Sequence, residues 1–221
     1  MKTFLSKCLT FFWSKSNHKE YSFNSREYWE SRYQNGGNSG SGSYGCLANF
    51  KAEVLNDFVN KHQIKSIIEF GSGDGNQLNL ANYPKYIGYD VSEKAIEICK
   101  EKFKQDPTKE FRILEESLSL NGHAELCLSL DVIFHLIEYP VFDSYMRTLF
   151  SSSTNYVIIY SSNNEFEMAK HVKSRDFQKW IIKNLGNKWE LFRVVKNKYP
   201  YNETKPDETS FSDFFFYKKV N

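Results

Sequence analysis

Short apolar runs recur along the chain at regular intervals. They are rich in β-branched and aromatic residues and lie at residues 66–70, 86–90, 111–114, 126–130 and 156–160. Each run has the length of a buried strand, and the segments between them carry apolar residues at helical spacing. Strands that alternate with helices in this way predict an α/β fold built on a parallel sheet.

The helical segments have recognisable ends. We expect helices at residues 47–62, 93–105, 140–150 and 177–185, with a shorter one at 76–82. Ser92 is a good N-cap, Pro140 suits a first helical turn, and Gly186 stops the last helix. Two late apolar runs, at 189–195 and 211–217, predict an antiparallel pair that completes a seven-stranded, Rossmann-like sheet with helices on both faces.

The first strand runs directly into a glycine-rich turn. Glu69 precedes it by two residues, the glycines are Gly71, Gly73 and Gly75, and Asp90 ends the next strand. Glycines at alternate positions let the backbone turn sharply and approach a ligand closely. A carboxylate at the place of Asp90 can accept both hydroxyls of a ribose. A glycine turn without any ligand is the alternative.

The spacing of these glycines separates two classes of nucleotide site. Dinucleotide-binding folds carry G-x-G-x-x-G and place a helix against a pyrophosphate, whereas here the third glycine comes one residue earlier. No Lys-Ser/Thr pair follows to make a phosphate-binding loop. The pattern therefore favours a nucleoside that carries a cationic sulfonium.

A second glycine-rich stretch, at residues 35–45, precedes the sheet. Its composition is that of a flexible linker, but it contains Tyr44 and lies between aromatic helical segments. We interpret it as a lid that covers a ligand. Tyr28, Tyr33 and Tyr44 could then face a sulfonium through their rings, and ordinary aromatic packing is the alternative.

Charge and cysteine content narrow the possible partners. The chain carries 29 basic and 27 acidic side chains without a block of like charge, which gives no support to nucleic-acid binding. The four cysteines are scattered, and we interpret them as free thiols of a cytoplasmic protein. We expect no metal site and no membrane span.

Residues 1–20 mix lysines with aromatics; we expect a packed or frayed extension, with weak association with a membrane surface as the alternative.

Candidate catalytic residues follow the fourth strand and the fifth. His135 lies where open α/β sheets bind their ligands and could act as a general base with an ordinary pKa of about 6.5, oriented by Asp131 or Glu138. A structural histidine is the alternative. His171 and Arg175 could bind an anionic acceptor, because the guanidinium matches a phosphate; a solvated basic segment is the alternative.

From residue 20 onward the chain resembles class I S-adenosylmethionine (SAM)-dependent methyltransferases, and more narrowly those of bacterial surface-polysaccharide (capsule and O-antigen) gene clusters. Besides the glycine turn, the features that carry this are residues 28–33, 40–45, 129–136 and 160–163, and His171 with Arg175. Glu125 departs from the Asp that many relatives carry, and we expect no consequence. The cofactor residues that the resemblance implies are Tyr28, Tyr33, Tyr44, Glu69, Gly71, Ser72, Gly73, Asp74, Asp90, Val91, Leu130 and Asp131.

The resemblance also implies an organisation and an activity. Residues 21–221 would form a single domain, with a cofactor-covering segment at 21–46 and acceptor-side elements at 165–221. Glu115 or Glu116 could hold the adenine amine, or both could be solvated glutamates. The expected reaction is methyl transfer to an oxygen of a carbohydrate-linked, anionic acceptor: a sugar hydroxyl, a phosphate or a phosphoramidate. A small-molecule N-methyltransferase and a non-catalytic cofactor-binding adaptor are the alternatives, and the oligomeric state stays open.

Overall fold

The computed structural model describes residues 23–115, 122–165, 167–169 and 171–220. The extension that we expected over residues 1–20 lies outside the described residues, as does Glu116.

A seven-stranded sheet forms the centre of the molecule, in the order β3-β2-β1-β4-β5-β9-β8. Its strands are β1 (Ser66–Phe70), β2 (Lys85–Asp90), β3 (Lys109–Ile113), β4 (Ala124–Leu130), β5 (Ser153–Ser161), β8 (Trp189–Val195) and β9 (Asp213–Lys219). Strands β1 to β5 pair in parallel, and β9 pairs antiparallel with both β5 and β8. This confirms the predicted α/β fold and the late antiparallel pair.

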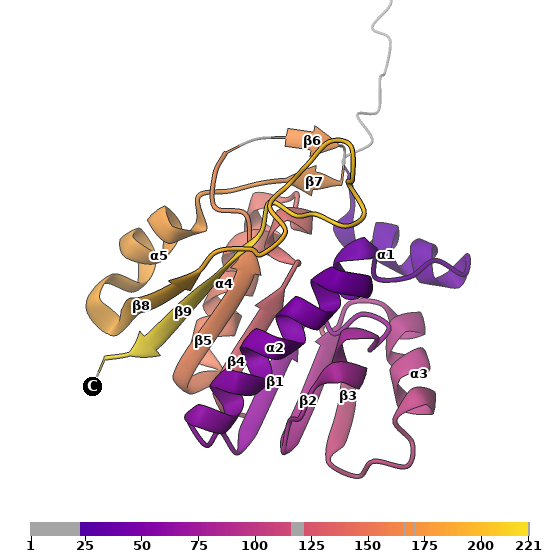
Figure 1. Ribbon diagram of the computed structural model, residues 1–221, viewed down its shortest axis with the longest axis horizontal. Helices are drawn as coiled ribbons and strands as arrows, with labels where there is room; N and C mark the ends of the chain where they lie inside the picture. Colours follow the sequence, from indigo (N-terminus) through magenta and orange to yellow (C-terminus); the bar gives the residue numbers. More distant parts are fainter. Residues whose placement is uncertain (1–22, 116–121, 166, 170, 221) are drawn as a thin grey trace, which may run out of the picture.

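Helices cover both faces of the sheet. Helices α2 (Gly45–Lys61) and α3 (Glu93–Lys102) pack on one face, and α4 (Tyr139–Ser151) and α5 (Phe177–Leu185) pack on the other. Figure 1 shows α2 running across the near face of β1 and β4. Helix α1 (Ser25–Gln34) precedes them, and short 3-10 turns lie at η1 (Ser41–Ser43), η3 (Ile133–His135) and η4 (Gly186–Lys188).

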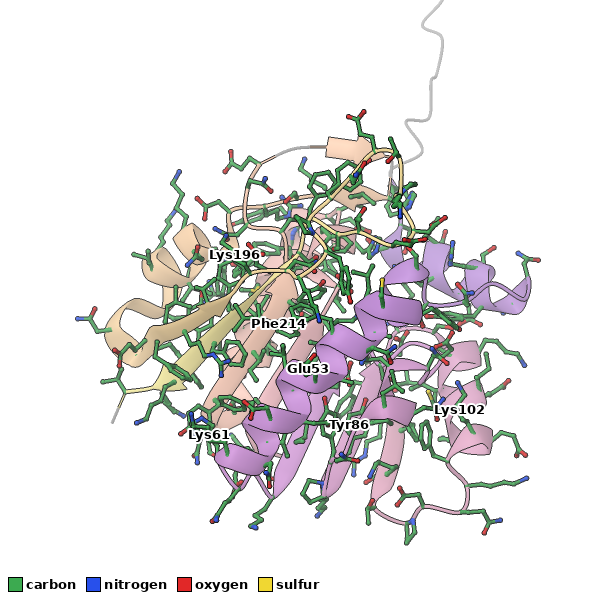
Figure 2. All side chains as sticks on the ribbon, viewed as in Figure 1. Glu53, Lys61, Tyr86, Lys102, Lys196 and Phe214 are labelled. Carbon is green, nitrogen blue, oxygen red and sulfur yellow. The ribbon has the colours of Figure 1, made fainter. Side chains whose placement is uncertain are left out.

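The side chains of β9 show how the sheet separates two cores. Phe214 and Phe216 pack in the cluster beneath α2, whereas Phe215 and Tyr217 pack in the cluster beneath α4 and α5. Figure 2 shows Phe214 over the strands on the near face, beside α2. Successive side chains of a strand point to opposite faces, so a run of four aromatic residues supplies both cores at once.

The structure differs from the sequence prediction in two places. The helix expected at residues 76–82 is a single 3-10 turn, η2 (Gln77–Leu80), because Pro84 and the start of β2 leave no room for further turns. The segment after β5 forms a small antiparallel ribbon, β6 (Glu167–Ala169) with β7 (Val172–Lys173), which the sequence did not predict. Figure 1 places this ribbon beyond the upper end of the sheet.

The strand order creates one position suited to a ligand. The chain leaves β1 toward β2 and β3 on one side, and β4 leads to β5 on the other, so β1 and β4 form a switch point. Open α/β sheets bind ligands at the carboxyl ends of such strands. The glycine turn follows β1, and residues 131–138 follow β4 at this same edge.

Candidate functional site

The glycine turn adopts a conformation that only glycine tolerates. Gly71 has φ +87°, and a Cβ there would lie 2.4 Å from Cγ2 of Val132. Gly73 has φ +56°, and its Cβ would lie 2.3 Å from the Ser39 hydroxyl oxygen. Left-handed backbone and the absence of side chains let the turn pass between β4 and the lid segment. The glycine turn therefore allows other parts of the molecule, or a ligand, to approach its backbone closely.

Asp90 holds the turn from the next strand. Its Oδ2 accepts a hydrogen bond from Gly73 N at 2.9 Å, and its Oδ1 accepts one from Ser92 N at 3.0 Å. The carboxyl is buried, which raises its pKa above the ordinary value although hydrogen bonds from the N–H groups of Ser92, Gly73 and Val91 act in the opposite direction. Because each carboxylate oxygen can accept two hydrogen bonds, the group keeps capacity for a further donor.

The lid segment is docked on the glycine turn. Asp74 Oδ2 accepts hydrogen bonds from Ser39 N at 3.1 Å and from the Tyr44 hydroxyl at 2.8 Å, while Asp74 N donates to Ser39 Oγ at 3.0 Å. Tyr33 Oη lies 2.9 Å from Ser39 Oγ. Burial acts to raise the pKa of Asp74, but the hydrogen bonds that it accepts outweigh this and lower it. Asp74 and Tyr44 thus fasten the lid.

Helix α1 is fixed across the strand ends by its first turn. Arg26 donates from Nη1 to Val91 O at 3.0 Å and from Nη2 to Leu114 O at 2.5 Å. Glu138 accepts from Ser25 N at 3.0 Å and lies 2.5 Å from Ser25 Oγ. These contacts join the start of α1 to the ends of β2 and β3 and to the start of α4.

A cavity of about 440 Å³ lies among the glycine turn, α1, the lid and the start of α4. This volume is typical of a site for a small molecule or cofactor. The predicted cofactor residues in its wall are Tyr33, Glu69, Gly71, Ser72, Gly73, Asp90, Val91, Leu130 and Asp131, and Glu115 and His135 also line it. Tyr28, Tyr44 and Asp74 are outside this wall, so the first two do not cover the cavity as expected: Tyr28 stacks on His171, and Tyr44 fastens the lid.

His135 lines this cavity in a defined tautomer. Its Nδ1 lies 2.8 Å from the main-chain oxygen of His171. A carbonyl only accepts, so Nδ1 carries the proton and Nε2 of the neutral ring keeps a lone pair. Burial lowers the pKa of His135 to about 4, although the hydrogen bond to His171 acts in the opposite direction. The ring of Trp29 lies edge-on at 4.8 Å between centroids. His135 is therefore a neutral base at physiological pH.

Neither carboxylate that we expected to orient His135 does so. Asp131 pairs with Lys51 Nζ at 2.8 Å and accepts a hydrogen bond from Ser212 Oγ at 3.0 Å. Glu138 is engaged by Ser25. The group that orients the imidazole is a main-chain carbonyl of the loop between β6 and β7, which sequence reasoning could not pair with it.

Lys51 is a fully buried cation at the edge of the cavity. Its side chain is 1% exposed, and Nζ lies 5.3 Å from the centre of the Tyr160 ring. Asp131, its partner, has φ +58°, which suits an Asp better than most residues. Glu69 is also buried; burial raises its pKa to about 7, while the Tyr86 hydroxyl donates to it at 2.8 Å.

The side chains of His171 and Arg175 have different neighbours. The His171 ring stacks on Tyr28 with centroids 4.9 Å apart. Arg175 donates from Nη2 to Leu136 O at 3.1 Å and to Ile137 O at 2.6 Å, and its guanidinium lies 5.0 Å from the centre of the Phe142 ring. The structure does not form the two-residue anion clamp that the sequence suggested, because each side chain has a packing role.

Several residues at the site were missed in the sequence. Those with the clearest contacts are Arg26, Trp29, Lys51, Gln77 and Ser212. Lys51 left a signal, since it stands four residues from both Leu47 and Leu55 on the apolar face of a helix. A lysine there must be paired. The others carry no local signal, since distant segments bring them to the site.

Two buried polar atoms next to the cavity have no partner among the residues that the structure describes. They are Ser72 Oγ and Gln77 Oε1, and both residues line the cavity. Buried polar groups are nearly always paired, so a polar ligand at this place would complete the site. Within the described residues, no cluster of three or more His, Cys, Asp or Glu side chains is arranged to hold a metal ion. No helix in the described part of the chain could span a membrane.

Comparison with known proteins identifies the fold. No protein-family model and no curated protein matches the chain. Among solved structures, the N-methyltransferase NodS from Bradyrhizobium japonicum WM9, in complex with S-adenosyl-L-homocysteine (SAH), superposes with a TM-score of 0.68 at 13% identity, covering 90% of this chain and 100% of that one. Magnesium protoporphyrin IX methyltransferase (ChlM) from Synechocystis PCC 6803, with bound SAH, gives 0.65 at 13% identity, covering 88% and 98%.

A third structure, the methyltransferase domain of a bacterial Hen1, gives a TM-score of 0.59 at 18% identity and covers 78% of this chain and 98% of that one. The chain therefore has the Rossmann-like methyltransferase fold. At these identities the likeness establishes the fold, and activity has to be argued from the site.

Proposed function

We propose that this chain is a SAM-dependent methyltransferase. The observation that carries the proposal is the pairing of Asp90 with the backbone of the glycine turn, at the wall of a cavity at the sheet's switch point. Asp90 has lone pairs left for the ribose hydroxyls, and the turn presents backbone without side chains. The solved structures with this fold that contain SAH support the same cofactor.

The residues of the cavity suit this cofactor. Asp90 would hold the ribose, Leu114, Glu115 and Val132 would surround the base, and the glycine turn with Ser72 and Gln77 would face the amino-acid end. When bound, SAM supplies a methyl group on a sulfonium, and transfer is an in-line displacement. The protein must therefore position the acceptor and remove its proton.

His135 is the residue that we propose for proton removal. With Nδ1 held by the His171 carbonyl, Nε2 can take the proton of an acceptor hydroxyl as the oxygen attacks. The edge of Trp29 and the carbonyl contact fix the ring, so the base needs no reorientation during the reaction. An acceptor oxygen that is already ionised, such as a phosphate or phosphoramidate oxygen, would need positioning alone.

For the acceptor, we propose an oxygen of a carbohydrate-linked, anionic molecule used in surface-polysaccharide biosynthesis in the cytoplasm. The support is the sequence resemblance together with the basic residues Lys173 and Arg175, which follow β5 in the part of the chain expected to face the acceptor. A small-molecule N-methyltransferase is the second candidate, since a neutral imidazole can also deprotonate an amine and NodS is an N-methyltransferase with this fold.

Methyl transfer can be tested directly on the full chain. SAM labelled in its methyl group is incubated with nucleotide sugars, sugar phosphates and phosphoramidates, and products are analysed by mass spectrometry and NMR. We expect label on an oxygen of a phosphorylated carbohydrate. Label on nitrogen would establish the second candidate instead. Cofactor binding without any methylated product across the panel would favour an adaptor that does not catalyse transfer.

A further inference from the structure

A second hollow lies outside the cofactor cavity, between α4, α5 and the segment around β7. Its volume is about 560 Å³. It is lined by aromatic and charged side chains: Tyr139, Phe142, Glu165, Lys173, Ser174, Arg175, Asp176, Lys179, Trp180 and Lys183. We call it the basic groove.

The charges of the basic groove are unbalanced. Four basic side chains face two acidic ones. Asp176 is partly committed, because its Oδ1 caps α5 by accepting a hydrogen bond from Lys179 N at 3.0 Å. Lys179 and Lys183 are exposed, stand one helical turn apart on α5, and pair with no other described residue. Lys179 and Lys183 therefore present ammonium groups to the groove that pair with no carboxylate among the described residues.

An aromatic surface adjoins these cations. The Tyr139 side chain is 56% exposed. Trp180 lies deeper, with Nε1 donating to Asp143 Oδ1 at 2.9 Å. An exposed aromatic ring beside a cluster of cations suits a ligand that contains both a ring and a phosphate. The ring of the ligand can stack on the aromatic side chain, while the cations neutralise the phosphate.

The groove and the cofactor cavity share a wall. Leu136, Glu138 and Val141 face the cavity, whereas Tyr139 and Phe142 face the groove. Arg175 fixes this wall from the groove side through its hydrogen bonds to Leu136 O and Ile137 O. Residues 136–142 thus separate a molecule bound in the groove from the cavity in which the methyl group would be transferred.

We propose that the basic groove binds the phosphate or pyrophosphate group of the methyl acceptor, with Lys179 and Lys183 as its principal contacts. The acceptor's reacting oxygen then reaches over residues 136–142 to His135. This inference rests on the proposed methyltransferase function for the identity of the ligand, while anion binding by the groove can be measured separately.

The test is calorimetry with inorganic pyrophosphate and the full chain, in saturating SAH so that the cofactor cavity is not a competing site. The variant Lys179→Gln/Lys183→Gln is compared with Lys61→Gln/Lys100→Gln, which removes the same charge from exposed positions on α2 and α3. We expect pyrophosphate to bind the wild type and the control alike. The groove variant should bind about tenfold more weakly, the factor that two exposed charge contacts supply together.

Three results would overturn the proposal: no pyrophosphate binding to the wild type, equal affinity in all three proteins, or equal losses in the groove variant and the control. Sedimentation with phosphatidylglycerol vesicles adds a further check. Vesicle binding that is lost in the groove variant, with no binding of pyrophosphate, would identify a lipid-facing surface instead. The affinity for SAM is measured in parallel. A protein that does not bind SAM would contradict the proposed function, whereas the pyrophosphate result could still be interpreted.

Discussion

At the scale of single residues, the site depends on side chains whose charge state is set by burial. His135 is kept neutral and has one nitrogen engaged by a carbonyl, which leaves the other nitrogen as a base. From the sequence we expected an ordinary histidine, which would lose activity by protonation near pH 6.5. Burial lowers its pKa to about 4, so this expectation has to be corrected.

The pH dependence of methyl transfer tests the corrected value. A base with a lowered pKa stays deprotonated until the pH falls to that value, so the rate for a hydroxyl acceptor should hold steady from pH 8 to pH 5. It should fall to half near pH 4, where half of His135 is protonated. An acid limb centred near pH 6.5 would show that His135 is not the base or is not shielded as described.

Substitution of His135 distinguishes the hydrogen-bonding role of Nδ1 from the role of Nε2 as a base. In His135→Asn the side-chain amide can still donate to the His171 carbonyl, but the base is lost. We expect kcat for a hydroxyl acceptor to fall about 10²- to 10⁴-fold with little change in KM for SAM. His123→Asn, at an exposed position, is the matched control and should behave as wild type. A His135→Asn rate within threefold of wild type would rule out the catalytic role.

Lys51 makes a prediction about stability. Lys51→Met leaves Asp131 without its cation, and breaking a buried pair from one side costs about 3–5 kcal/mol, with the lower end expected because Asp131 is 19% exposed. In Lys51→Met/Asp131→Asn the unpaired charge is gone, so the double variant should be more stable than the single one. Urea unfolding followed by circular dichroism measures both. A double variant that is less stable than Lys51→Met would contradict the pairing.

At the scale of elements, the site is assembled by segments that cross the ends of the strands. The lid, α1 and the loop before β9 contribute Ser39, Arg26 and Ser212, and each is fixed by hydrogen bonds to residues after β1, β2, β3 or β4. The lid, residues 35–45, contains few apolar side chains, so its order should depend on Asp74 and on the ligand beneath it.

Hydrogen exchange tests the lid as an element. Amides of residues 36–44 should exchange faster in Asp74→Asn than in wild type, because the anchor for Ser39 N and the Tyr44 hydroxyl is weakened. SAM should slow exchange across the same residues in wild type, with α5 unchanged as an internal reference. Asp57→Asn, at an exposed position on α2, is the control. Equal exchange with and without SAM would make the segment a linker.

At the scale of the whole molecule, the sequence predicted the sheet and the position of the ligand edge. Periodicity records which residues are buried, so strands such as 126–130 and 156–160 and the Phe214–Phe216 alternation could be recognised locally. The glycine turn and Asp90 could be recognised because their conformation demands particular residues.

The remaining features depend on which distant side chains meet. The carbonyl of His171 lies 36 residues from His135, and Ser212 lies 81 residues from Asp131. No local pattern encodes such pairs, which is why both carboxylates expected to orient His135 were misassigned. The lowered pKa of His135 results from burial by the same distant segments, so it could not be predicted from the sequence either.

The central claim is that the cavity beside Asp90 binds SAM, and titration calorimetry tests it most directly. Asp90→Ala removes the charged acceptor for the ribose hydroxyls, a loss of about 1.5–3 kcal/mol, equivalent to about 10- to 100-fold in affinity. Thermal melting confirms that the variant is folded, and Asp57→Asn, at an exposed position on α2, serves as the control. We predict one SAM per chain in wild type and in the control, with at least tenfold weaker binding in Asp90→Ala. A folded Asp90→Ala protein that binds SAM as tightly as wild type would contradict the account.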